Sequence, residues 1–297
     1  MTKLGYNEDR SPSAAEPVVR LGYIDFLNSL PVYYGLESGA VKLPAGVELV
    51  KSVPAALNRK LLAGEIDVSA MSSVEYARHA DELVLLPDLS INSAGFVHSV
   101  NLLCRNGVES LEGGTISMSA ESATSHVLLR ILLAKRFGIR ANLVVGDADP
   151  EEIGAKSSTG SGYDGVLLIG DSAMKASLAY PNLGRIDLGD EWTRWTGTPM
   201  VFALWAARRD LAPDALAAVH RALLASKAWG RANRATIVEH ARKNVFLSRA
   251  YMERYFRDLN YDLDRPKLAG LKRFYDEAAA LGEIARVPSL SPIEVKA

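Results

Sequence analysis

Small polar residues gather where the strands that we predict give way to predicted helices. They are Asn28, Ser29, Ser72, Ser73, Ser99, Ser122, Thr124, Ser125, Gly170 and Asp171. Hydroxyl and amide groups at a helix start, together with the free N–H groups of the first turn, can bind a carboxylate or another anion. Each of these residue types is also an ordinary helix cap, so it is their number that indicates a shared site. The sequence therefore predicts a site for a small molecule that carries carboxylates.

Signals for standard catalytic chemistry are weak. The five histidines show no paired spacing typical of a zinc site, and neither a G-x-S-x-G nor a P-loop sequence is present. His98 is next to Ser99, but strand alternation should point the two side chains in opposite directions. We therefore predict no metal site, and we expect the chemistry to rest on hydroxyl and amide groups.

A group of aromatic residues leaves two alternatives open. Its members are Trp192, Trp195, Phe202 and Trp205. They could line the ligand site or pack at a hinge, and the residue pattern does not choose between these roles.

Strand-to-helix units position the polar residues. The expected strands are 18–22, 47–52, 66–70, 115–119, 141–145 and 165–169, with helices at 30–36, 55–62, 74–79, 123–137 and 172–179. Residues 83–86 read as a short edge strand, and Asn28 and Ser29 as caps of the first helix. Alternation of strand and helix predicts a mostly parallel sheet with helices on both faces. The carboxyl ends of parallel strands share one edge, so the polar residues should converge there.

Two long extended segments, 95–104 and 199–206, bracket one complete block of strand-helix units, and the chain reads as mostly helical from 212 to 288. This order predicts a chain that passes twice between two lobes. Lobe one would hold 18–99 and 202–297, including the C-terminal helices, and lobe two would hold 100–201. Such a double crossing is typical of the two-lobe α/β fold of type II periplasmic binding proteins.

Composition narrows the functional class. The chain has 297 residues, 48% of them hydrophobic and 23% charged, and a formal net charge of −1. This balance argues against nucleic-acid binding, which usually requires a basic surface. Residues 1–17 are polar and lack the apolar core of a signal peptide, so we expect a disordered leader and a cytoplasmic protein. No apolar run reaches the roughly 20 residues that span a membrane, and the sequence leaves the oligomeric state open.

Four segments resemble chorismate dehydratase of the futalosine route to menaquinone. They are residues 24–31 (IDFLNSLP), 69–76 (SAMSSVEY), 95–100 (GFVHSV) and 191–205 (EWTRWTGTPMVFALW). The resemblance extends over most of the chain from Val18 onward. The family usually has TGLPF where this chain has TGTPM at 196–200, a departure that could reshape the wall of the site.

The resemblance implies a hydro-lyase, a carbon-oxygen lyase that removes water from chorismate to give 3-(1-carboxyvinyloxy)benzoate without a cofactor. For this reaction we hypothesise that Asn28 and Ser99 are the catalytic residues, with the Asn28 amide near the reacting carbon stabilising developing charge. The remaining polar residues would bind substrate. Ser29, Ser72 and Ser99 would bond a carboxylate or the leaving hydroxyl, 122–125 would bind the other carboxylate, and Ser73, Gly170 and Asp171 would complete the site.

Two alternatives remain open on sequence grounds. A solute-binding protein for a small carboxylate, cytoplasmic or exported, would share the fold, because fold alone does not determine function. The related 1,4-dihydroxy-6-naphthoate synthase also shares it. That enzyme carries a histidine base at the end of a lobe-two strand, where this chain has Gly170 and Asp171, which favours the dehydratase.

Overall fold

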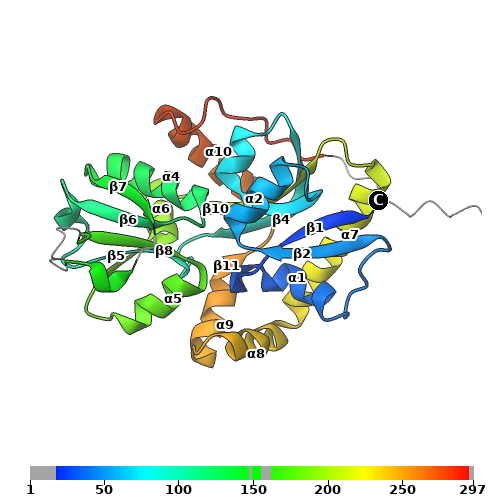
Figure 1. The fold of residues 1–297 in the computed structure, drawn as a ribbon, viewed down its shortest axis with the longest axis horizontal. Helices are drawn as coiled ribbons and strands as arrows, with labels where there is room; N and C mark the ends of the chain where they lie inside the picture. Colours follow the sequence, from blue (N-terminus) through cyan, green and yellow to red (C-terminus); the bar gives the residue numbers. More distant parts are fainter. Residues whose placement is uncertain (1–17, 147–148, 155–161, 294–297) are drawn as a thin grey trace, which may run out of the picture.

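The computed structural model describes residues 18–146, 149–154 and 162–293. The expected disordered leader, 1–17, lies outside the described residues. Within them, the chain forms two β-sheets with helices packed around each (Figure 1).

The strands fall into a six-stranded and a five-stranded sheet. The first has the order β11-β4-β10-β3-β1-β2 and the second the order β7-β6-β8-β5-β9. Their bounds are β1 Val19–Ile24, β2 Val47–Ser52, β3 Val68–Ser72, β4 Leu83–Ser93, β5 Val100–Cys104, β6 Thr115–Ser119, β7 Asn142–Gly146, β8 Gly165–Ile169, β9 Gly184–Asp187, β10 Met200–Arg208 and β11 Leu259–Asn260.

Helices follow most of the strands and then dominate the C-terminal third. The α-helices are α1 Leu30–Glu37, α2 Pro54–Leu62, α3 Ser73–Arg78, α4 Ala123–Ile131, α5 Gly170–Ala179, α6 Leu188–Thr196, α7 Pro213–Ala232, α8 Arg234–Asn244, α9 Arg249–Asp258 and α10 Arg265–Ala280. Short turns of 3-10 helix are η1 Leu27–Ser29, η2 Val108–Leu111 and η4 Pro150–Glu152, and η3 Leu132–Phe137 is a π-helical extension of α4.

Most strands of each sheet run in one direction, and each sheet has a reversed strand next to its parallel core. β10 runs antiparallel to β3 and β4, and β5 runs antiparallel to β8 and β9. The two-residue β11 is also reversed, because it pairs antiparallel with β4. β5 and β10 are the first strands that the chain forms after each passage between the sheets. The passages therefore bring the carboxyl ends of β1, β3, β6 and β8 towards a common gap between the lobes. The division of the chain at residues 99 and 201 remains our proposal.

The strand predicted at 83–86 is the first part of a longer one, so its predicted length was wrong. β4 is eleven residues long. Among the described strands, its first part pairs with β10 alone, and β11 pairs only with Asn92 and Ser93 at its far end. Pro87 and Asp88 interrupt the apolar pattern at its middle, where Asp88 has a φ of 56° and the register with β10 shifts. A bulge, rather than a chain break, accommodates this pair.

Apolar strands supply the core of both lobes. Every residue of β8 is buried, as are most residues of β10, because helices cover both faces of each sheet. Trp192 and Trp205 are fully buried, so these two aromatic residues pack in the interior. No helix among the described residues is long and apolar enough to cross a membrane.

Candidate active site

A small cavity lies between the facing edges of the two sheets and encloses about 50 Å³. Its polar lining comes from Asn28, Ser72, Ser99, Ser122, Ser125 and Gly170. Six of the ten residues singled out in the sequence thus meet in one place. The other four, Ser29, Ser73, Thr124 and Asp171, lie beside the cavity without lining it. The ligand-binding roles of all ten stay predictions.

Asn28 lies in η1, the turn between β1 and α1. Its amide oxygen is buried and has no hydrogen-bond partner among the described residues. A buried acceptor without a partner costs about 1–3 kcal/mol, so such groups usually have a use. Because Asn28 lines the cavity, a ligand there is placed to satisfy this amide.

Ser29, the residue after Asn28, forms its side-chain hydrogen bonds within the protein. Its hydroxyl donates to the backbone oxygens of Ile24, at 2.6 Å, and Phe26, at 3.0 Å. The expectation that the Ser29 side chain caps α1 was wrong, because it makes no capping bond to the helix. These two bonds instead fix the turn that presents Asn28.

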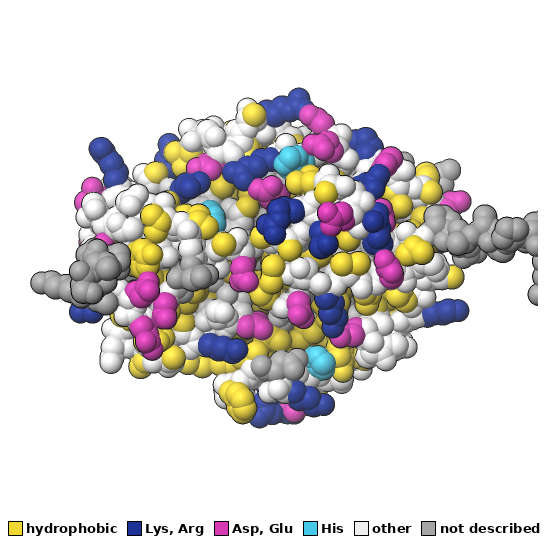
Figure 2. Space-filling model, in the orientation of Figure 1, with side chains coloured by type: hydrophobic (Ala, Val, Ile, Leu, Met, Phe, Trp, Pro, Cys, Tyr) yellow, Lys and Arg dark blue, Asp and Glu magenta, His cyan; other side chains and the backbone are white. Residues whose placement is uncertain are grey.

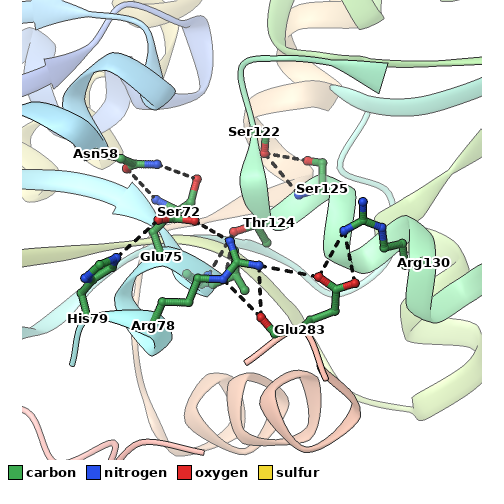
Figure 3. Close-up of polar contacts among 12 residues, drawn as sticks. Asn58, Ser72, Glu75, Arg78, His79, Ser122, Thr124, Ser125, Arg130 and Glu283 are labelled. Atoms are coloured by element: carbon green, nitrogen blue, oxygen red, sulfur yellow. Dashed lines mark hydrogen bonds and ion pairs between the residues drawn. The ribbon is translucent and has the colours of Figure 1, made fainter. Parts of the chain in front are cut away.

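Ser72 ends β3 and is held in place by Asn58 of α2 (Figure 3). The Asn58 amide nitrogen lies 3.2 Å from the Ser72 hydroxyl, and the Ser72 N–H donates to the Asn58 oxygen at 3.2 Å. Asn58 is 5% exposed and was missed by the sequence reasoning. The sequence feature that could have identified Asn58 is its position between Leu57 and Leu61, which puts a polar amide on the buried face of a predicted helix.

Ser73 and Thr124 join the two lobes beside the cavity. The Ser73 hydroxyl donates to the backbone oxygen of Val201 at 2.8 Å and lies 3.3 Å from the Thr124 hydroxyl. Thr124 also accepts from the N–H of Val74 at 3.3 Å. Both side chains are fully buried. We call these contacts, together with the one between Leu27 and Asp171 described below, the seam.

Ser122 and Ser125 place hydroxyls at the start of α4. The Ser122 oxygen accepts from the N–H of Ser125 at 3.3 Å, and the two hydroxyl oxygens are 2.9 Å apart (Figure 3). Ser122 is therefore the helix cap that its sequence position predicts. The pair presents two hydroxyls to the cavity where the dipole of α4 favours an anion.

Ser99 lies in the first passage between the lobes. Its hydroxyl makes one long bond, 3.3 Å to the backbone oxygen of Val97, and faces the cavity. His98 does not line the cavity: its Nε2 lies 2.8 Å from the Asp258 carboxylate. The backbone of His98 has a φ of 62°, a strained value for a residue with a side chain, and its N–H donates to Asp187 at 2.7 Å. Asp187 and Asp258 thus fix the passage that carries Ser99.

Gly170 begins α5 with a φ of 61°. A Cβ atom at this position would lie 3.1 Å from the ring of Phe26, so glycine lets the two lobes approach closely. The next residue, Asp171, accepts the N–H of Leu27 at 3.3 Å, across the seam. Burial raises the pKa of Asp171, and this hydrogen bond opposes the rise.

The walls between the polar groups are apolar, and the sequence reasoning identified few of them. They are Ile24, Phe26, Pro54, Ile91, Val97, Val100, Ile169, Phe202 and Ala203. Of the aromatic group noted in the sequence, Phe202 lines the cavity, and Trp192 packs against Trp195 and Phe274. The other wall residues occupy ordinary strand and loop positions, which in a sequence look like core.

Charge is excluded from the cavity and concentrated at its rim. None of the lining residues is ionisable. Outside the seam, Glu283, which follows α10, accepts from Arg130 of α4 at 3.1 and 3.2 Å (Figure 3). Arg78 of α3 donates to the backbone oxygen of Glu283. We call this cluster the latch, because Arg78 and Arg130 belong to different lobes.

No cluster of metal-binding side chains occurs in the part of the chain that the structure describes. On the face shown in Figure 2, acidic and basic side chains are interspersed, in keeping with the net charge of −1.

Comparisons with known proteins agree on one family. A family described as menaquinone biosynthesis matches residues 19–280. A chorismate dehydratase from Thermus thermophilus is 33% identical over 88% of this chain and 94% of its own length. A 1,4-dihydroxy-6-naphthoate synthase from the same organism is 26% identical over 93% of this chain and 99% of its own length.

Solved structures confirm the predicted fold. A protein from Archaeoglobus fulgidus has a TM-score of 0.73 at 24% identity and covers 90% of this chain and 98% of its own. A Candida albicans protein described as having the generic periplasmic binding protein fold has a TM-score of 0.66 at 14% identity, covering 92% of both chains. The aliphatic sulphonate binding protein of Escherichia coli has a TM-score of 0.63 at 15% identity, covering 95% and 96%. At these identities the likeness shows the fold alone.

Proposed function

This chain belongs to the menaquinone-biosynthesis family that includes chorismate dehydratase, and we propose that it removes water from chorismate to give 3-(1-carboxyvinyloxy)benzoate. The similarity to the dehydratase over most of both chains supports this reaction. The observation in the site that carries the proposal is the Asn28 amide oxygen, buried at the cavity without a partner.

The reaction suits a site built from neutral groups. A ring C–H proton leaves, the hydroxyl on the neighbouring carbon departs, and the ring becomes aromatic. Aromatisation drives the reaction, so the enzyme must chiefly hold the substrate in a reactive geometry. We propose that the hydroxyls of Ser122 and Ser125 bind one carboxylate of the substrate. Ser72 and Ser99 would bond the other carboxylate or the departing hydroxyl.

The proton acceptor is then the substrate itself. The cavity lining offers no carboxylate, imidazole or amine. We propose that the enolpyruvyl carboxylate of chorismate takes the ring proton and passes it to the departing hydroxyl, which leaves as water. The Asn28 side-chain NH2 group would donate to the substrate and stabilise the negative charge that develops during this transfer, and the Asn28 oxygen would accept a hydrogen bond from the substrate hydroxyl. Because this reaction eliminates water, the proposed enzyme is a hydro-lyase. We propose that it acts in the cytoplasm and without a cofactor.

The cavity volume adds a condition for binding. About 50 Å³ is room for a few water molecules, whereas chorismate carries two carboxylates and a ring. The lobes must therefore separate to admit substrate and close around it. The two passages between the sheets, 94–99 and 188–199, are the places where that motion would occur.

The test is product analysis with purified protein, chorismate and no added metal, by liquid chromatography and mass detection. A product lighter by one water that keeps the enolpyruvyl ether is expected. Intact chorismate together with turnover of the cyclic futalosine-derived substrate would assign the chain to the naphthoate synthases. Binding of a carboxylate without turnover of either substrate would favour a solute-binding role.

A further inference from the structure

A second cavity lies behind the segment that carries Asn28. It encloses about 290 Å³ between α7, α8, α9 and β11, which adjoin one another in Figure 1. One wall is Pro31, three residues after Asn28. Gly230 of α7 packs directly against it, because a Cβ atom at this position would lie 2.1 Å from the Pro31 oxygen. The cavity is thus separated from the candidate active site by the start of α1.

Basic side chains dominate the lining of this cavity. Lys227, Arg231, Arg234 and Arg257 face a single lining carboxylate, Asp262. Asp262 lies 2.9 Å from the Lys227 amine and 2.8 Å from the Arg231 guanidinium.

Two further carboxylates lie close to the cavity, and each forms an ion pair with one of its basic side chains. Asp88 pairs with Lys227 at 2.9 Å, and Asp258 pairs with Arg257 at 3.1 Å. Arg234 has no carboxylate within 4.0 Å among the described residues, although it is the first residue of α8 and opens onto the cavity. The cavity therefore keeps one guanidinium whose charge is not balanced by the protein.

Tyr261 is an independent indication of a ligand, because its hydroxyl group has no hydrogen-bond acceptor in the described part of the protein. It lines the cavity and is only 8% exposed, and its hydroxyl is buried without a hydrogen-bond partner among the described residues. Burial raises the pKa of Tyr261 far above its usual range, so the hydroxyl keeps its proton, and the charge of Arg234 is close enough to oppose that rise. Among the described residues, Tyr261 thus brings a protonated donor without an acceptor to the same cavity as the unpaired Arg234, and an anionic acceptor would suit both.

Part of the remaining lining is apolar. Ile237, Phe256 and Leu259 line the cavity and are otherwise buried in the core, and Asn260 adds one neutral polar side chain. A wall of this kind favours a ligand with a ring or a hydrocarbon face over a bare inorganic ion.

From these contacts we propose that this cavity is a second ligand site, which binds a small organic anion with a carboxylate or phosphate group on an apolar ring. The charged group lies at Arg234, within reach of the Tyr261 hydroxyl, and the ring packs on Ile237 and Leu259. Arginine suits this role because its planar fork matches both carboxylate and phosphate.

The test is isothermal titration of the whole protein with benzoate and phenyl phosphate, with inorganic phosphate as the ring-free probe. We expect a dissociation constant of about 1 mM or tighter for at least one ring-bearing probe. Arg234→Gln should weaken this binding by about tenfold, since it removes one charge-assisted hydrogen bond. Tyr261→Phe should also weaken it while raising Tm, because the variant no longer buries an unpartnered hydroxyl.

Two control variants locate the binding. Arg242→Gln removes another exposed arginine of α8, one that pairs with Glu239 and does not line the cavity, and should leave affinity unchanged. Asn28→Ala should leave it unchanged as well. Binding lost in Asn28→Ala but kept in Arg234→Gln would overturn the proposal by placing the anion in the active site. Absence of binding at about ten times the expected dissociation constant, or inorganic phosphate binding as tightly as phenyl phosphate, would also overturn it.

Discussion

At two of the helix starts, a residue that faces the cavity is followed by one that does not. Asn28 lines the cavity, whereas the Ser29 hydroxyl donates to two backbone oxygens. Ser72 lines the cavity, whereas the Ser73 hydroxyl bonds Val201 and meets Thr124 across the seam. The cavity and the seam are therefore made from neighbouring residues of the same kind.

The difference lies in which polar atoms have partners. Seam groups are satisfied by the protein and so stabilise the fold and the closed arrangement of the lobes. The Asn28 amide oxygen is not satisfied, which costs free energy that binding of a ligand can recover. Substitutions in the cavity should therefore change catalysis, and substitutions in the seam should change stability.

The largest effect is expected for Asn28→Ala. If the amide stabilises developing charge, its loss should lower kcat by about 10²-fold. Tm should stay the same or rise, because the amide oxygen has no partner among the described residues to lose and its burial costs free energy. Rates of product formation and thermal unfolding measure the two quantities. Full turnover with only a raised KM would remove Asn28 from the catalytic groups.

Ser29→Ala is the matched control for that variant. It removes the hydroxyl bonds to the oxygens of Ile24 and Phe26, although Phe26 still accepts the Ser29 N–H at 3.1 Å, so the free energy of unfolding should fall by about 1 kcal/mol. Once folded, the variant should keep most of its kcat. A loss of turnover equal to that of Asn28→Ala would restore Ser29 to the substrate-binding groups predicted from the sequence.

The next effect is on substrate affinity. Ser72→Ala should raise KM by about tenfold, the value of one hydrogen bond to a charged group. Ser73→Ala should instead lower Tm, because Val201 and Thr124 lose a buried partner. A Ser73→Ala variant that instead raised KM as much as Ser72→Ala, without lowering Tm, would contradict the assignment of Ser72 to substrate binding and of Ser73 to stability.

A smaller effect is expected at the latch. Glu283→Gln removes the charge that Arg130 binds, so the closed arrangement loses one partly exposed ion pair, worth roughly 0–1 kcal/mol. KM should rise a few-fold at low salt, and the difference from the parent protein should shrink at about 1 M salt. The control is Glu277→Gln. It breaks an ion pair with Arg273 that lies within α10 and does not connect the two lobes. Equal effects of the two variants would show that Glu283 does not act on closure.

Local patterns were enough to predict the two-lobe fold. Changes from apolar strands to capped helices are visible over a few residues, as at Ser122, and parallel strands bring such points to one edge. The two extended segments were also predicted, but their antiparallel pairing as β5 and β10 was not. The predicted features depend on residues that are close in sequence.

Contacts between residues far apart in the sequence could not be predicted from local patterns. The continuation of β4 from Pro87 to Ser93 was missed, because it depends on pairing with β10, more than a hundred residues later, on both sides of the irregularity at Asp88. His98 meets Asp258 at a separation of 160 residues. The choice between Asn28 and Ser29 as the residue facing the cavity depends on the geometry of a 3-10 turn, which residue type alone does not specify.

The smallest expected effect is that of pH on turnover. Since no lining residue of the cavity is ionisable, kcat should stay constant, within about twofold, from pH 6.5 to about 9. Stability should behave differently, because burial lowers the pKa of His126 and His220 below their ordinary 6.5. The unfolded chain then binds more protons than the folded one, so the free energy of unfolding falls as pH drops below 6.5. Rates and Tm measured across this range test both statements. A kcat that follows a single ionisation above pH 6.5 would reveal a protein base acting on the substrate and would contradict proton transfer to the substrate's own carboxylate.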